Sequence, residues 1–151
     1  MAAMKRALIF LLLFCATIAM AATPRTMRVD YYHTGNSSTE MFSLDEVVIE
    51  PLAWPGNPDK PIDDTNLGKY YFEVRDQATN NLLYSRGFSS IYGEWETTDE
   101  AKKINRTFSE SLRFPAPEKP VHIVLKKRDK ENAFREIWSL GVDPKGMFVN
   151  T

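Results

Sequence analysis

One segment near the middle of the chain, Lys69 to Glu96, constrains the fold more than any other. It begins with YYFEVR, in which Tyr70, Phe72 and Val74 alternate with Tyr71, Glu73 and Arg75. This period-two pattern is typical of a strand with one buried side. The polar run DQATNN then predicts a turn, and Leu82 to Ser90 resumes an extended pattern. The segment therefore predicts a β-hairpin, followed directly by a group of aromatic residues.

The rest of the chain repeats this extended pattern. Alternation of apolar and polar residues predicts strands at Met27 to Tyr32, Leu44 to Pro51, Thr107 to Phe114, Val121 to Lys126 and Phe134 to Val142. His33 to Thr39 has the composition of a loop. The run TTDE, with Thr97 as N-cap and Glu100 three residues later, fits a capping box and predicts one or two helical turns. About seven strands and one short helix predict an all-β domain, an immunoglobulin-like or related Greek-key β-sandwich.

Pro51 to Leu67 is the longest irregular segment, because its four prolines exclude regular structure. A loop of this length is either functional or packed over the edge of a sheet. We expect Trp54 to anchor it by burial, with a contact to a ligand as the alternative. Its acidic residues lack the spacing of a calcium-binding loop, so we interpret them as turn-forming residues and leave calcium open.

The N-terminus has the features of a signal peptide. Lys5 and Arg6 precede an apolar run that is too short to span a membrane comfortably, and Ala19-Met20-Ala21 fits a cleavage site. We therefore expect residues 1–21 to be a signal peptide and residues 22–151 to be one exported domain with no membrane span after cleavage. Lipidation at Cys15 is the alternative, although the bulky Phe14 precedes it. Cleavage would remove this single cysteine and lower the formal net charge from −1 to −3, so the domain would fold without disulfides. The periplasm, the cell surface and the medium all remain open as destinations.

No catalytic constellation is visible. A zinc peptidase needs two histidines one helical turn apart, whereas His33 and His122 stand far apart and are expected at the surface or its rim. The chain has no G-x-S-x-G elbow, and the mature chain would have no cysteine nucleophile. The basic run Lys126 to Arg128 is flanked by acidic residues, which argues against nucleic-acid binding. The sequence therefore predicts no enzyme, no metal site and no cofactor.

Aromatic residues are the remaining candidates for a contact surface. Neighbouring residues of a strand point to opposite faces, so one tyrosine of each adjacent pair must face outward or lie under a loop. The candidate contact residues are Tyr92, Trp95, Trp54 and Tyr71. We expect such a surface to dock a neighbouring domain; a glycan or protein ligand is the alternative.

Several runs carry a resemblance to a known family: YYHTGNSSTE, FSLDEVVIEPLAWPGNPDKPIDDTNLGKYYFEVRD, LLYSRGFSSIYGEWETTDEA and NRTFSESLRFP. From about Thr26 to Asn150 the chain resembles the N-terminal domain of the IgA-peptidase-like zinc metallopeptidases of Gram-negative gut bacteria. SRGFSSIYGEWETTDEA is its most specific part. The resemblance implies a β-sandwich that precedes a separate zinc catalytic domain carrying H-E-x-x-H, which this chain lacks. No catalytic or metal-binding residue of the family falls within the resemblance.

These observations predict a non-catalytic accessory domain of an exported metallopeptidase. Its partner would be the catalytic domain, or a substrate that it positions. A stand-alone exported module that binds protein or glycan is the alternative, and a truncated peptidase gene is a third. The substrate and the oligomeric state are not determined by the sequence.

Overall fold

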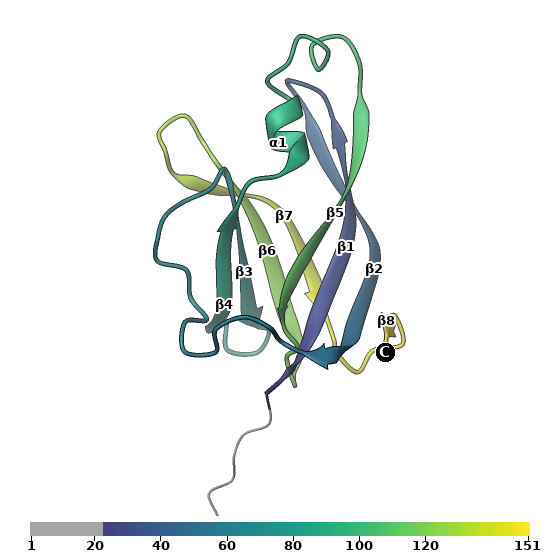
Figure 1. Cartoon of the computed structure of the whole chain (residues 1–151), viewed down its shortest axis with the longest axis vertical. Helices are drawn as coiled ribbons and strands as arrows, with labels where there is room; N and C mark the ends of the chain where they lie inside the picture. Colours follow the sequence, from purple (N-terminus) through teal and green to yellow (C-terminus); the bar gives the residue numbers. More distant parts are fainter. Residues whose placement is uncertain (1–22) are drawn as a thin grey trace, which may run out of the picture.

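Two four-stranded sheets pack face to face in the computed structural model, which describes residues 23–151 (Figure 1). The signal peptide expected over residues 1–21 lies outside the described residues. The elements are β1 (Arg25–Gly35), β2 (Glu40–Ala53), β3 (Tyr70–Asp76), β4 (Leu82–Phe88), α1 (Ile91–Trp95), β5 (Arg106–Pro115), β6 (Val121–Arg128), β7 (Phe134–Val142) and β8 (Val149–Asn150). The expected all-β sandwich with one short helix is confirmed. The seven expected strands are β1 to β7, and the structure adds the two-residue β8, which is too short to give a pattern.

The sheets have the strand orders β5-β1-β2-β8 and β4-β3-β6-β7. β1 pairs antiparallel with β2 and β5, and β3 pairs antiparallel with β4 and β6. The chain therefore crosses from one sheet to the other after β2, β4, β5 and β7. β4 and β5 are both edge strands, and they lie on the same side of the sandwich (Figure 1).

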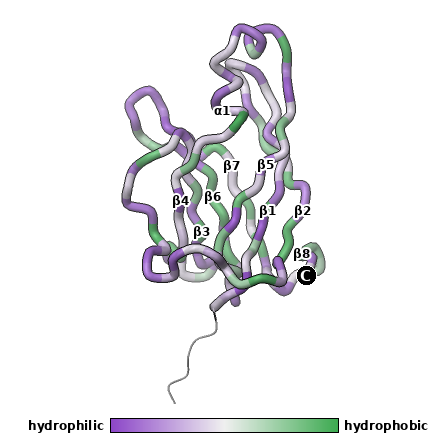
Figure 2. The backbone as a smooth tube through the Cα atoms, viewed as in Figure 1, coloured by the Kyte–Doolittle hydropathy of each residue, from purple (hydrophilic) through white to green (hydrophobic). Residues whose placement is uncertain are grey.

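The core lies between the two sheets. Each strand presents alternate side chains to it, and the contributing buried residues are Met27, Val29, Tyr31, Val47, Ile49, Phe72, Val74, Tyr84, Leu112, Phe114, Val121, Ile123, Leu125 and Val142. Figure 2 shows hydrophobic residues along the strands and a hydrophilic turn between β6 and β7. The aromatic rings of Phe72 and Phe114, one from each sheet, meet at 6.1 Å between centroids. With no disulfide expected in the mature chain, these apolar contacts hold the sheets together.

The helix predicted from the capping box is wrong in position. α1 begins at Ile91, six residues before the expected N-cap Thr97, and its N-cap is Ser90, whose hydroxyl accepts a hydrogen bond from the Gly93 amide. Residues 97–103 form turns instead. The Glu100 carboxylate accepts bonds from Trp95 and Arg106, so it acts as a side-chain partner and not as part of a capping box.

The irregular segment between β2 and β3 begins at Trp54 and runs along the edge of β4. The Ser85 amide of β4 donates to the carbonyl of Pro61, and the Gly87 amide donates to the carboxylate of Asp63. Packing over a sheet edge, one of the two roles expected for this loop, is therefore what the structure shows. No helix within residues 23–151 is both long enough and apolar enough to cross a membrane.

Candidate functional site: a buried ionic cluster

His33 lies at the end of the inward face of β1. The alternation of Met27, Val29 and Tyr31 continues to His33, which is only 1% exposed. The loop and surface position expected for His33 is therefore wrong, because β1 runs further than its apolar residues indicate. His122 is exposed on β6, as expected.

Both ring nitrogens of His33 face carboxylates. Nε2 lies 2.9 Å from Glu40 on β2, and Nδ1 lies 3.2 Å from Glu110 on β5. A carboxylate only accepts hydrogen bonds, and a neutral imidazole has a single N–H. The arrangement therefore favours the doubly protonated imidazolium, which donates to both partners.

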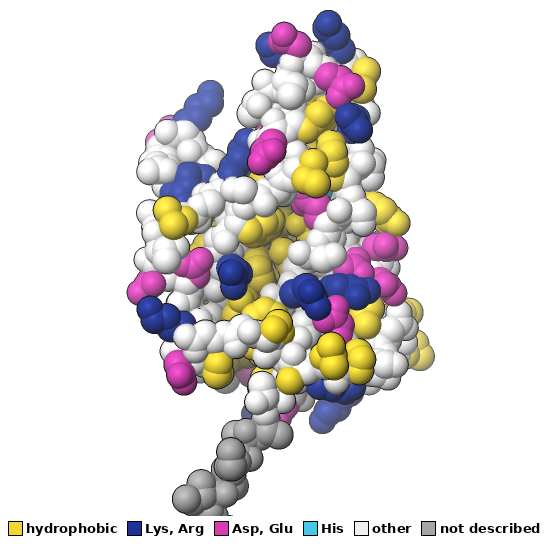
Figure 3. All heavy atoms as spheres, in the orientation of Figure 1, with side chains coloured by type: hydrophobic (Ala, Val, Ile, Leu, Met, Phe, Trp, Pro, Cys, Tyr) yellow, Lys and Arg dark blue, Asp and Glu magenta, His cyan; other side chains and the backbone are white. Residues whose placement is uncertain are grey.

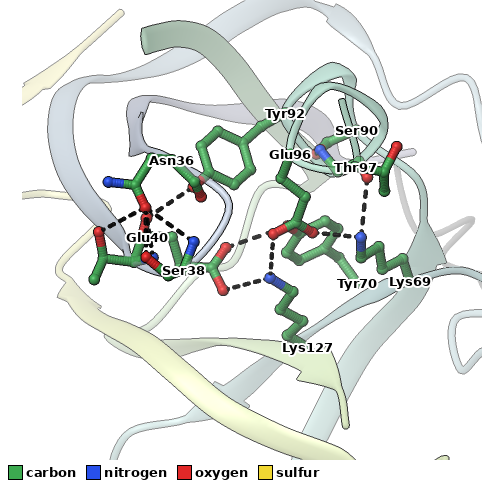
Figure 4. Close-up of polar contacts among 12 residues, drawn as sticks. Asn36, Ser38, Glu40, Lys69, Tyr70, Ser90, Tyr92, Glu96, Thr97 and Lys127 are labelled. Atoms are coloured by element: carbon green, nitrogen blue, oxygen red, sulfur yellow. Dashed lines mark hydrogen bonds and ion pairs between the residues drawn. The ribbon is translucent and has the colours of Figure 1, made fainter. Parts of the chain in front are cut away.

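The second sheet and α1 complete this group. From β6, Lys127 Nζ donates to Glu40 at 2.7 Å and to Glu96, which follows α1, at 2.9 Å. Lys69, just before β3, pairs with Glu96 and donates to the carbonyl of Gly93 in α1. We call His33, Glu40, Glu96, Glu110, Lys69 and Lys127 the His33 cluster; Figure 4 shows its part around Glu40 and Glu96. It joins both sheets and the helix at one end of the sandwich.

The charges of the His33 cluster balance when His33 is protonated, with three carboxylates facing three cations. Burial lowers the pKa of His33, but its hydrogen bonds to Glu110 and Glu40 and their charges outweigh this, so the pKa is raised. Burial alone would raise the pKa of Glu40, but hydrogen bonds from His33 and Lys127 and their charges lower it below its usual value. Burial would likewise raise the pKa of Glu110, but the hydrogen bond and charge of His33 and the hydrogen bond from Tyr31 lower it. The pKa of Lys127 is raised because Glu40 and Glu96 outweigh its desolvation.

Aromatic rings enclose the cluster. The Tyr92 ring stacks on His33 at 3.7 Å, and its hydroxyl contacts the carbonyls of Asn36 and Thr39. Burial raises the pKa of Tyr92 to about 12. Tyr70 donates its hydroxyl hydrogen to Glu40.

The close approach of α1 to the sheets depends on two glycines. A Cβ on Gly93 would lie 2.9 Å from the Tyr70 ring. Gly35 has a φ of 157°, and a Cβ there would lie 2.6 Å from the Tyr92 hydroxyl. Both positions therefore favour glycine, and together they bring Tyr92 over His33.

The four candidate contact residues do not form one surface. Tyr92 is 0% and Trp95 is 8% exposed, so the outward position expected for these two is wrong. They form a small second core with Ala101, because α1 folds back over the end of the sandwich. Tyr71 is half-buried and donates to Ser85. Trp54 is half-buried and packs edge-to-face on Tyr84, as an anchor of the loop would; a contact to a ligand stays the alternative prediction.

The His33 cluster was missed from the sequence, although a signal for it exists. His33 comes two residues after Tyr31, so it lies on the same face of β1 as the buried apolar residues. Glu110 lies on the same face of β5 as Leu112 and Phe114. A polar residue at a core position is more informative than an exposed apolar one.

The geometry of the cluster suits a structural role. His33 is covered, both of its nitrogens are engaged, and the carboxylates around it already bind cations. Among residues 23–151 no group of three or more histidine, cysteine, aspartate or glutamate side chains is arranged to hold a metal ion. In the loop before β3, the Asp63 carboxylate already accepts bonds from Thr65 and Gly87.

Comparison with known proteins adds one finding. A family model described as the N-terminus of peptidase M64 matches residues 19–139. This range includes β1 to β6, the first part of β7 and every member of the His33 cluster. No curated protein matches the chain.

Proposed function

Because the chain belongs to the peptidase M64 N-terminal family, we propose that it is a non-catalytic accessory domain of a zinc metallopeptidase. The family match carries this proposal, since it assigns most of the chain to the N-terminus and not to a catalytic region. The domain packs against a catalytic domain or positions its substrate.

The structure supports a scaffolding role in two ways. His33 is buried, and each of the carboxylates around it is paired with a cation of the His33 cluster. The cluster also joins both sheets and α1 through charged hydrogen bonds, which gives this end of the sandwich a defined shape. A domain that orients another domain or a substrate benefits from such rigidity.

We further propose that the domain acts after export. The sequence supports this, because its N-terminus has the three parts of a signal peptide in the usual order: basic Lys5 and Arg6, an apolar run, and the cleavage site Ala19-Met20-Ala21. A binding module that uses Tyr92 and Trp95 on an outer face is not favoured, because both side chains are buried.

A peptidase assay tests the proposal. The purified domain is incubated with a quenched fluorogenic peptide library, with added zinc and separately with a chelator. We expect no cleavage above the buffer control in either condition. Zinc-dependent cleavage that the chelator abolishes would overturn the proposal.

A further inference from the structure

The open side of the sandwich carries a hollow between the edge strands β4 and β5. Its volume is about 310 Å³, the lower end of the range for ligand sites, and its lining includes Trp54, Phe72, Phe88 and Leu112. Figure 3 shows hydrophobic side chains in the hollowed middle of this face, with basic side chains on either side. The hollow thus reaches the edge of the apolar core between two strands: Trp54 and Phe88 are partly exposed there, and Phe72 and Leu112 are buried beneath them.

The two edges that border the hollow differ in how they are covered. Along β4, the amides of Ser85 and Gly87 already donate to the loop before β3. Within residues 23–151, the backbone of β5 pairs only with β1. A ten-residue strand with a free edge is the template onto which an extended peptide adds by β-augmentation.

Arg86 is the second unusual feature of the hollow. Residues Tyr84, Arg86 and Phe88 of β4 share one face, so the arginine stands between two aromatic residues on the side that faces the core. Within the described chain, no carboxylate lies within ion-pair distance of Arg86. The other arginine at the hollow, Arg113, pairs with Glu50. The charge of Arg86 helps to lower the pKa of Asp63, in the loop before β3, without pairing with it, so the exposed guanidinium can receive a carboxylate that comes from outside.

We propose that this hollow binds an extended peptide segment of another polypeptide. The segment adds to the free edge of β5, inserts an apolar side chain between Trp54, Phe72 and Leu112, and places a neighbouring aspartate or glutamate against Arg86. Main-chain bonds supply the affinity, and the apolar pocket with its arginine supplies the specificity. The inference rests on the proposed function, because it gives a substrate-positioning domain the surface that holds polypeptide.

Peptide binding is measured directly, without any peptidase. The probes are fluorescein-labelled, end-blocked octapeptides of serine and threonine with a central valine, leucine, phenylalanine or tryptophan followed by glutamate. Matched peptides carry glutamine or lysine instead of glutamate. Fluorescence anisotropy gives the affinity, and hydrogen exchange of β5 amides reports whether the edge is covered.

We expect saturable 1:1 binding by at least one glutamate peptide and slower exchange in residues 106–115. Arg86→Met keeps the apolar stem and should weaken binding at least about tenfold, the size expected for a charged hydrogen bond. Replacing the peptide glutamate by glutamine should lower the affinity for the unchanged protein by the same factor. The Arg86→Met protein should bind the glutamate and glutamine peptides with nearly equal affinity. Arg135→Met removes the same charge from an exposed position on β7 and should leave the affinity unchanged.

Three outcomes would overturn the proposal. The first is no saturable binding by any peptide up to about 1 mM. The second is equal affinity of the Arg86→Met and unchanged proteins. The third is self-association of Arg86→Met without any effect on peptide binding, which would mean that Arg86 only protects an edge from pairing with another copy. Because none of these readouts involves cleavage, failure here leaves the accessory-domain proposal standing.

Discussion

Replacing His33 by phenylalanine removes the charge at the centre of the His33 cluster while it keeps a ring that stacks on Tyr92. Glu110 then retains the Tyr31 hydroxyl as a donor but loses its cation, whereas Glu40 retains Lys127. Because His33 is 1% exposed, solvent does not replace the lost charge. Removing one partner of a buried ion pair costs about 3–5 kcal/mol, and we expect a loss of this size in the free energy of unfolding.

The loss should depend on pH in a defined direction. The pKa of His33 is raised above its ordinary 6.5 in the folded state, so the imidazolium contributes fully below about pH 6.5, and its contribution is lost as the pH rises through the folded pKa. The pKa values of Glu40 and Glu110 are lowered, so their contributions are complete above 4.5 and are lost as the pH falls through the folded values. The stability difference between the two proteins should therefore be largest between pH 4.5 and 6.5 and shrink as the pH rises through the folded pKa of His33.

Urea denaturation followed by circular dichroism at several pH values measures this difference, and an unchanged m-value shows that the variant folds. A matched cycle adds Glu110→Gln, which should destabilise the unchanged protein but restore part of the stability of His33→Phe. A loss below about 1 kcal/mol at pH 6, or a difference that grows as the pH rises from 6.5, would refute a charged His33.

Further predictions concern the surroundings of the cluster, each measured by urea denaturation. Tyr92→Phe removes the hydroxyl from two backbone carbonyls and should cost about 1 kcal/mol; no loss would mean that these contacts do not stabilise α1. Gly35→Ala should cost about 1–3 kcal/mol, because its Cβ would meet the Thr39 carbonyl oxygen at 2.1 Å; a neutral result would contradict this packing. Lys127→Met leaves two carboxylates without their shared cation and should cost about 3 kcal/mol. Its matched control, Lys102→Met at an exposed ion pair, should stay within about 0.5 kcal/mol, and equal losses would argue against the cluster.

The strands could be predicted because most of them have one apolar face toward the core and one more polar face toward solvent. The expected bounds of β3 and β7 agree with the structure, and apolar residues alternate regularly in β3. In β7 the alternation holds from Trp138 to Val142, but a register shift before Trp138 places Phe134 on the other face, against Tyr71. The position of α1 could not be predicted in the same way, since five residues give no helical period. Its N-cap, Ser90, has no glutamate three residues later and so does not match a capping box. Thr97 and Glu100 do match the capping box, but no helix begins there.

The candidate site as a whole could not be predicted, because its six charged residues come from six different strands or loops. Apolar periodicity assigns charged residues such as Glu40 and Lys127 to the surface, and only the pairing of β1 with β2 and β5 brings the acids to His33. The interior position of Tyr92 has the same cause, since it depends on how the chain crosses between the sheets after β4. Local patterns thus determined the strands, and tertiary contacts determined which charged side chains are buried.

The central claim, that this domain assists a peptidase without cleaving peptides itself, is tested most directly by adding it in trans. The catalytic domain of an M64 peptidase, expressed without its own N-terminal domain, is mixed with the purified chain, and complex formation and kcat/KM on a polypeptide substrate are measured. We expect a 1:1 complex and a higher kcat/KM, with no cleavage by the chain alone. The absence of a complex together with an unchanged kcat/KM would contradict the account.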